Sequence, residues 1–150
     1  MAIDVNVHPL LYKSIYDESD FAFWEREFGM GHMGPMDYDE ILAELDYGGI
    51  EKSVLLPLDL TTTAGGWIAT NEQVASIVKD HPDRFVAFAS VDPHRPDAPE
   101  ALEKAFTGLG ARGLSLHPAK QRFWMTEDCM EPLFELCRKY DRPMMVDAGL

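Results

Sequence analysis

The sequence predicts an α/β fold built on parallel strands, and three observations carry this prediction. Apolar runs of strand length alternate with helical stripes in units of roughly 30 residues, the size of a βα repeat. The run "RFVAFASVD" is apolar on both faces, as in sheets that are covered by helices. Strands that are joined through right-handed helical crossovers lie parallel to one another.

The first strand is expected in "DVNVHPL", residues 4–10. Side chains alternate along a strand, so Asp4, Asn6 and His8 should share one face while Val5 and Val7 pack behind it. An acid, an amide and an imidazole in register are unusual on a strand of a buried sheet, which makes this face a candidate site. Asp4, at the start of the strand, is as well explained by a capping or supporting role.

A long loop is expected from Pro9 to Met36, rich in aromatic residues and ending in the glycine-spaced "GMGHMGPM". Stretches of this length between elements are usually functional. Trp24, Phe28 and Met30 can form a lid over an apolar substrate or simply pack on the protein, and the pattern leaves both readings open.

The remaining elements follow from helix caps, apolar stripes and glycine stops. Helices are expected from Asp37 to Gly48, from Thr70 to Pro82, from Asp97 to Gly108, and around 133–140, where Leu133, Phe134, Leu136, Cys137 and Tyr140 form one face. Strands are expected in "KSVLLPL", "RFVAFASVD", "RGLSLH" and "PMMVDAG", with a Thr- and Gly-rich loop after the first of these.

Five parallel strands can form an open doubly wound sheet or the first five strands of an eight-stranded barrel of about 250 residues. The sequence stops three residues after Asp147, at the end of a strand that no helix covers. We therefore expect residues 1–150 to be an incomplete amino-terminal portion of a single barrel domain. A free-standing open α/β domain is the less favoured alternative.

Composition excludes several classes of partner. The sequence holds 13 Lys and Arg against 26 Asp and Glu, a net charge of -13, which repels nucleic acids and anionic membranes. It carries no targeting signal and no apolar run of about 18 residues, so a cytoplasmic location is expected. Cys129 and Cys137 are predicted on one helix about 12 Å apart, too far to bridge, and are expected to be reduced.

Polar residues follow four of the five predicted strands: Asn6 and His8, then Ser90 and Asp92, then Ser115 and His117, and finally Asp147. The carboxyl ends of parallel strands carry the active site in both candidate architectures. His and Asp side chains that converge there can bind a divalent metal and leave a position for water.

Five phrases, "IDVNVHP", "GIEKSVLLP", "NEQVASIVKDHPDRFVAFASVDP", "GARGLSLHP" and "RPMMVDAG", resemble the amidohydrolase-related family of metal-dependent TIM-barrel hydrolases and decarboxylases. The resemblance runs from Ile3 to the end of the sequence. It implies a (β/α)8 TIM barrel of which this sequence supplies the first five strands. In that family the first strand carries a His-x-His metal pair, the fifth a further metal-binding His, and a late strand an Asp.

Two matched positions depart from that pattern. Asn6 stands where the first His is usual and Asp147 where the fifth-strand His is usual, whereas His8 matches the second His. The expected metal ligands are accordingly His8, Asp147 and Asn6, holding zinc or manganese, with no metal if the two departures abolish the site. Some relatives in the superfamily work without a metal.

The resemblance implies an enzyme that hydrolyses or decarboxylates a small carboxylated cyclic or aromatic substrate. The expected catalytic residues are Asp147 and His117, and the expected substrate-binding residues are Asn6, Lys120, Arg122 and Trp24. A barrel that binds a ligand or a partner subunit without catalysis is the alternative, and assembly into homo-oligomers is possible. Arg84, His81 and His94 are expected to be structural or surface residues.

Overall fold

A computed structural model describes residues 2–30 and 33–149. Its parallel strands are β1 (Ala2–Val7), β2 (Ile50–Leu55), β5 (Phe85–Ala87), β6 (Leu114–Leu116) and β7 (Met144–Val146). The first three pair in the order β1-β2-β5, and β6 pairs with β7. A parallel bridge between Ala89 and Leu114 joins the two groups. These strands therefore lie in chain order, and their pairing is parallel, as the helical crossovers predict.

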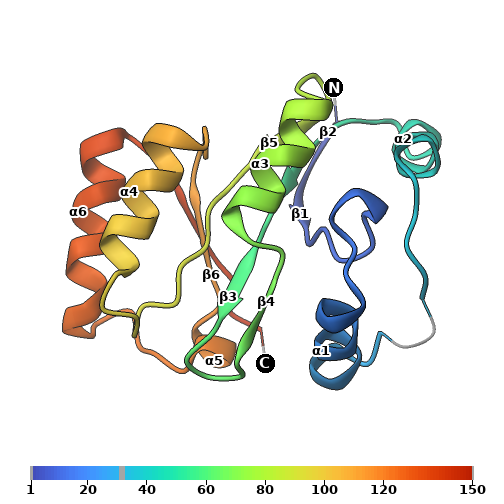
Figure 1. The fold of residues 1–150 in the computed structure, drawn as a ribbon. Coiled ribbons are helices and arrows are strands. Elements are labelled where there is room, and N and C mark those ends of the chain that lie inside the picture. Colours follow the sequence, from blue (N-terminus) through green and yellow to red (C-terminus); the bar gives the residue numbers. More distant parts are fainter. Residues whose placement is uncertain (1, 31–32, 150) are drawn as a thin grey trace.

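The helices are η1 (Lys13–Ile15), α1 (Glu18–Phe28), α2 (Tyr38–Tyr47), α3 (Asn71–Asp80), α4 (Ala98–Gly108), α5 (Pro118–Gln121), η2 (Asp128–Met130) and α6 (Glu131–Tyr140). Helices α2, α3, α4 and α6 connect successive parallel strands, and Figure 1 shows α4 and α6 side by side. The predicted β-α alternation from residue 37 onward is confirmed.

Two apolar clusters hold the strands to these helices. One joins α4 and α6 to β6 through fully buried Leu102, Leu114 and Leu133. The other joins α3 to β2 and β5 through Leu55, Ile77 and Phe85, each at most 1% exposed. Both clusters draw on the apolar stripes of the sequence, because each stripe faces the strand beside its helix.

Helices α3 and α4 both begin where the sequence predicts, but different groups stabilise their first turns. At α3 the expected capping box is present: Gln73 N donates to Thr70 Oγ1 at 3.1 Å, and Thr70 N donates to Gln73 Oε1 at 2.7 Å. At α4 the Asp97 side chain makes no cap hydrogen bond and instead pairs with Arg95. The helix begins where expected, but through Pro99 in its first turn rather than through an acidic cap.

The prediction of a long loop from residue 9 to 36 is wrong for its middle. Helix α1 occupies that segment, with the Asp17 side chain accepting from Ser19 N at 2.8 Å and Gly29 closing the helix in the left-handed conformation. The chain ends of the segment meet where Met36 N donates to Leu11 O at 2.7 Å. Part of the glycine-spaced run, residues 31 and 32, lies outside the described residues.

The predicted strand "KSVLLPL" and the loop after it also differ from the structure. Strand β2 ends at Leu55, and an antiparallel hairpin follows, made of β3 (Leu58–Leu60) and β4 (Gly66–Ile68). Its apolar residues pack on Phe23 and Trp24 of α1. The hairpin and α1 thus form a small layer of their own beside the parallel strands (Figure 1).

Strand β1 keeps only part of the predicted alternation. Its pairing with β2 shifts register between Asp4 and Val7. Such a shift turns the strand locally, and Val5 is 49% exposed rather than packed behind the polar face. Val7 is half-buried against the β2 core as expected.

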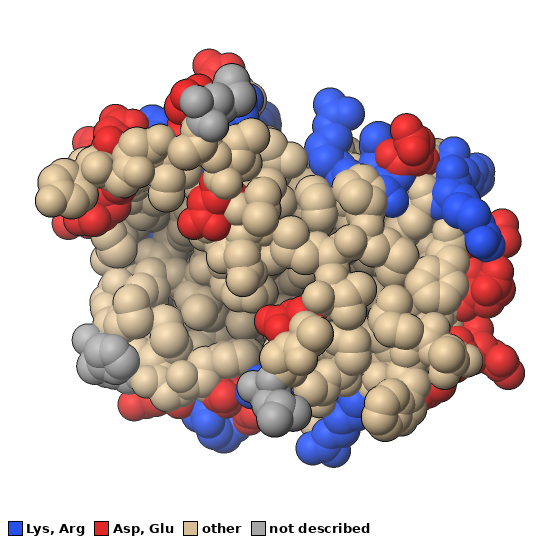
Figure 2. Space-filling model, turned by 180° about the vertical axis from the view of Figure 1, so that it is seen from behind, with Lys and Arg blue, Asp and Glu red and all other residues tan. Residues whose placement is uncertain are grey.

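The two cysteines and the charged residues complete the description. Cys137 is buried on α6, whereas Cys129 lies in the separate turn η2, so they are not on one helix, and both are free. Figure 2 shows a face that is mostly uncharged, with most of the charged side chains around its margin and a few acidic ones within it. Within residues 2–30 and 33–149, no helix has the length and apolar character to cross a bilayer.

Candidate functional site

A cavity of about 330 Å³ opens where β1, β6 and β7 end. Asn6, His8, His117 and Asp147 all line it, together with apolar side chains such as Leu56. These four residues are separated by up to 141 positions in the sequence and come together because parallel strands place their carboxyl ends at one edge. The structure thus groups the catalytic and metal-ligand candidates of the sequence in one place.

His8 is held in a defined orientation. Its Nδ1 lies 2.8 Å from the carbonyl oxygen of Leu56. A carbonyl only accepts hydrogen bonds, so Nδ1 carries a hydrogen, and in the neutral ring Nε2 keeps its lone pair. Metal-binding histidines are characteristically fixed in this way by a backbone carbonyl behind the ring.

His117 caps the short helix α5 and faces Asp147. Its Nδ1 accepts from Lys120 N at 3.4 Å, and its Nε2 lies 3.6 Å from Asp147 Oδ2. Burial lowers the pKa of His117 below the usual value, Lys120 and His8 lower it further, and Asp147 acts in the opposite direction. The ring is therefore neutral near pH 7, with its Nε2 hydrogen directed toward the carboxylate.

Asp147 follows directly after β7, and its backbone N donates to Leu116 O at 2.9 Å. Its Oδ1 accepts from Gly149 N at 2.8 Å, while Oδ2 is the oxygen nearest His117. The side chain is 44% exposed, which lets a ligand reach it. One carboxylate oxygen is thus used for support and the other is open to the cavity.

The donor set of the cavity suits a divalent cation. It comprises the free Nε2 of His8, the Oδ2 atom of Asp147 and the amide oxygen of Asn6, which lines the cavity from the irregular part of β1. Imidazole and carboxylate are ligands of zinc and manganese, and an amide oxygen favours the harder of the two. By ligand chemistry alone the set matches a divalent cation, and the Asn6 amide oxygen is the donor least suited to zinc.

The other three substrate-binding candidates do not line this cavity. Lys120 Nζ lies 4.9 Å from the centre of the Phe28 ring, in a cation-π contact. Arg122 is exposed and lines an adjoining hollow of about 630 Å³ with Trp124 and Asp147. Trp24 is 0% exposed, and its Nε1 donates to Trp67 O at 2.8 Å, which places it in the core below the hairpin.

Gln121 is a supporting residue that the sequence reasoning missed. It is fully buried on α5, and its Oε1 accepts from His117 N at 2.8 Å. Its Nε2 donates to Asp59 O and Val91 O, both at 2.9 Å. One side chain therefore ties the backbone of His117 to the hairpin and to the loop after β5, and the only available signal was a polar residue four positions after His117.

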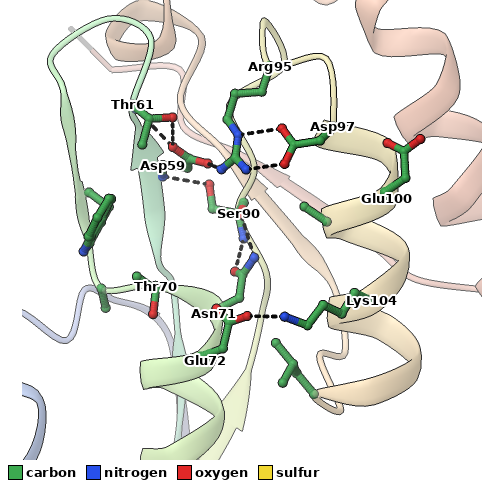
Figure 3. A pocket seen from close by; sticks show the side chains of 14 residues that line it. Asp59, Thr61, Thr70, Asn71, Glu72, Ser90, Arg95, Asp97, Glu100 and Lys104 are labelled. Carbon is green, nitrogen blue, oxygen red and sulfur yellow. Dashed lines mark hydrogen bonds and ion pairs between the residues drawn. The ribbon is translucent and has the colours of Figure 1, made fainter.

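A second cavity, of about 400 Å³, lies between the hairpin, α3 and α4 and is more polar (Figure 3). Arg95 bridges Asp59 at 2.8 Å and Asp97 at 2.6 Å. Asn71 clamps the backbone of Ser90 from both sides, at 2.9 Å for each bond. These groups satisfy one another, so we assign this cavity a structural role.

Four further residues that were noted in the sequence make structural contacts. Asp92 is fully buried, and its Oδ2 accepts from Thr62 N at 2.9 Å. His81 packs edge-on against Tyr38, with 4.3 Å between ring centres, and Arg84 pairs with Asp46 at 2.8 Å. Asp4 accepts from Asn6 N at 3.0 Å, which agrees with a supporting role.

Solved structures resemble this chain at low sequence identity. They include an uncharacterized TIM-barrel protein from Bordetella bronchiseptica (TM-score 0.71, 20% identity, 99% of this chain and 56% of that one). A second is a 2,6-dihydroxybenzoate decarboxylase from Rhizobium (TM-score 0.62, 20% identity, covering 99% of this chain and 50% of that one). A third is a mutant 5-carboxyvanillate decarboxylase from Novosphingobium aromaticivorans with bound manganese and a nitrobenzoic acid (TM-score 0.58, 24% identity, 71% and 33%).

These likenesses confirm the TIM-barrel fold class, and the chain spans a third to just over half the length of the three structures. No match was found among curated protein sequences. The sequence model described as amidohydrolase matches residues 3–150, nearly the whole chain. With its parallel strands and with His8, His117 and Asp147 at their carboxyl ends, the chain belongs to the amidohydrolase family.

Proposed function

We propose that the chain is the amino-terminal portion of a TIM-barrel enzyme that decarboxylates or hydrolyses a small carboxylated cyclic or aromatic substrate. The convergence of His8, His117 and Asp147 on one cavity carries this proposal. Two of the solved structures reported above are named as decarboxylases of carboxylated aromatic compounds, which supports decarboxylation. The similarity to these solved structures is a similarity of fold.

His8, Asp147 and Asn6 would hold the metal. When bound, a divalent ion, zinc or manganese, would supply a Lewis acid that polarises the substrate. The manganese in the 5-carboxyvanillate decarboxylase structure supports this assignment. The orientation of His8 by Leu56 O would keep its ligand nitrogen directed at the ion.

His117 and Asp147 would handle protons and substrate oxygens. A neutral His117 can donate its Nε2 hydrogen to a substrate oxygen, and its lowered pKa keeps this form populated near pH 7. Asp147 Oδ2 can accept a proton if it does not bind the metal. Arg122, at the mouth beside Asp147, would attract the carboxylate of the substrate.

The test is decarboxylation of 2,6-dihydroxybenzoate and 5-carboxyvanillate by the full-length protein, with metal content measured by plasma mass spectrometry. We expect carbon dioxide release in the wild type, and His8→Ala should abolish it and lower the metal content by about one divalent ion per chain. Asp147→Asn should lower activity by a factor of about 100 or more. Asp141→Asn, which changes an exposed carboxylate at the end of α6, is the matched control.

A binding protein without catalysis is the second candidate, because Asn6 and Asp147 replace two histidines of the family pattern. It predicts that ligands raise the melting temperature while no product forms. Full turnover in both His8→Ala and Asp147→Asn would refute the proposed site.

A further inference from the structure

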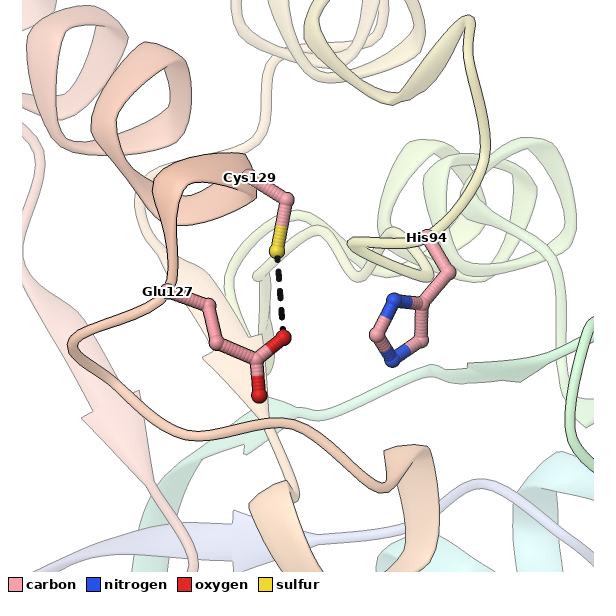
Figure 4. A group of neighbouring side chains, drawn as sticks. All are labelled: His94, Glu127 and Cys129. Atoms are coloured by element: carbon pink, nitrogen blue, oxygen red, sulfur yellow. Dashed lines mark hydrogen bonds between the residues drawn. The ribbon is translucent and has the colours of Figure 1, made fainter.

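A second cluster of potential metal ligands lies apart from the residues that line the active-site cavity. His94 follows β5, Glu127 precedes η2, and Cys129 lies within it. One ligand atom from each of the three side chains lies within 4.8 Å of the other two (Figure 4). The cluster combines a nitrogen, an oxygen and a sulfur ligand, a combination that suits zinc.

The spacing is close to that of a bound ion. Tetrahedral zinc with bonds of about 2.0 to 2.3 Å holds its ligands roughly 3.3 to 3.8 Å apart. Cys129 Sγ already lies 3.9 Å from Glu127 Oε2. The His94 side chain is exposed, so small rotations about its side-chain bonds can close the remaining distance.

His94 is oriented as metal-binding histidines are. Its Nε2 lies 3.1 Å from Arg122 O, and a carbonyl only accepts, so Nε2 carries the hydrogen and Nδ1 keeps its lone pair. Figure 4 shows the ring edge that bears both nitrogens turned toward Glu127 and Cys129. The backbone N of His94 also donates to buried Asp92, which fixes the start of this loop.

Glu127 is supported in the same way. Its Oε1 accepts from Trp124 N at 2.8 Å, while Oε2 faces Cys129 Sγ. One carboxylate oxygen thus accepts a hydrogen bond from the backbone, and the other is available to bind a metal ion. Hydrogen bonds of this kind to the non-coordinating atoms orient the ligands at metal sites.

We propose that His94, Glu127 and Cys129 form a second metal site, selective for zinc, with water in the fourth position. The ion would tie the loop after β5 to the turn that leads into α6. The site is independent of the function proposed above, because none of its three ligands lines the cavity of His8 and Asp147. A thiol hydrogen bond to Glu127 without any metal is the alternative that the experiment must separate.

Cobalt titration of the purified full-length protein separates these readings, because only a site with a cysteine ligand gives a thiolate-to-cobalt charge-transfer band. We expect this band in the wild type, its loss in Cys129→Ser, and its retention in Cys137→Ala. Cobalt at the His8 site lacks a sulfur ligand and gives no such band. Absence of the band in the wild type, or its persistence in Cys129→Ser, would overturn the proposal.

Zinc affinity gives an independent measurement. Glu127→Gln should weaken zinc binding by a factor of about 10 or more, whereas Asp128→Asn, an equal charge change on the next residue, should change it less than about twofold. Zinc should also slow alkylation of Cys129 by iodoacetamide in the wild type. Equal losses in the two variants would show that zinc responds only to local charge, and would refute the site.

Discussion

His117 Nε2 lies 3.6 Å from Asp147 Oδ2, and this contact joins the ends of two neighbouring strands across the cavity. The carboxylate is the main influence that raises the pKa of His117, against the larger effect of burial. Asp147→Asn removes that negative charge and leaves burial and Lys120 opposed only by a weaker backbone hydrogen bond. We therefore expect the pKa of His117 to fall further in the metal-free variant.

Nuclear magnetic resonance titration of the His117 ring measures this shift directly. The sign follows from the charged form: the imidazolium loses its stabilising partner, so protonation requires a lower pH. Asp141→Asn should leave the His117 titration unchanged. A His117 pKa that rises in Asp147→Asn would contradict the contact.

Replacing Gln121 should have a large effect on the free energy of unfolding, although this residue contacts no substrate. Gln121→Leu keeps the size of the side chain but leaves His117 N, Asp59 O and Val91 O without their partner. Buried groups left unpaired cost about 1 to 3 kcal/mol each, with partial relief by relaxation. We expect a loss of about 2 to 4 kcal/mol in the free energy of unfolding, measured in urea.

Glu135→Ala on the exposed face of α6 is the control for Gln121. Its side chain is 66% exposed, and its ion pair with Arg138 is on the surface, so the change should be below about 1 kcal/mol. A loss in Gln121→Leu that is no larger than the control would mean that the three hydrogen bonds contribute little.

Gly66 in β4 allows the hairpin to approach α1. A Cβ atom at this position would lie 2.9 Å from Phe23 Cγ and 2.7 Å from two further atoms of that buried ring. The whole ring would have to move, because Cγ is its attached end. Gly66→Ala should therefore destabilise the protein by about 1 to 3 kcal/mol in thermal or urea unfolding.

Gly108, at the end of α4, offers the matched substitution. A Cβ atom there meets nothing within 4 Å, so Gly108→Ala should be neutral or slightly stabilising. If both glycine variants behaved alike, close packing between the hairpin and α1 would not be the reason for glycine at position 66.

The elements that the sequence predicted well are those whose signals are local. The apolar stripe and capping box of α3 specify a helix with both of its first-turn partners, and the structure contains them. Helix α1 was missed although its aromatic residues stand at helical spacing, because aromatic clusters also occur in loops. Its burial depends on a hairpin some 30 residues later, which no local pattern reveals.

The same distinction holds for the candidate site. His8, His117 and Asp147 were found because each ends a strand, and parallel strands bring such ends together. Gln121 acts through three backbone groups that are up to 62 positions away, so its role depends on the tertiary fold. His94 stood alone in the sequence, and the structure brings it to Glu127 and Cys129.

The two tryptophans Trp24 and Trp124 distinguish core packing from a lid. Trp24 is 0% exposed and its Nε1 donates to Trp67 O, whereas Trp124 is 78% exposed and lines a hollow with Arg122 and Asp147. Trp24→Phe removes that hydrogen bond and part of a buried ring. We expect a loss of about 1 to 3 kcal/mol in the free energy of unfolding.

Trp124→Phe should change stability by less than about 0.5 kcal/mol, because solvent surrounds most of its ring. Exposed aromatic surface at a site entrance is suited to contact a ligand, so substrate should quench the fluorescence of Trp124 and leave that of Trp24 unchanged. Variants in which Phe replaces Trp67 and one of these two tryptophans report on the other separately. Quenching of Trp24 instead would return it to the substrate-binding role expected from the sequence.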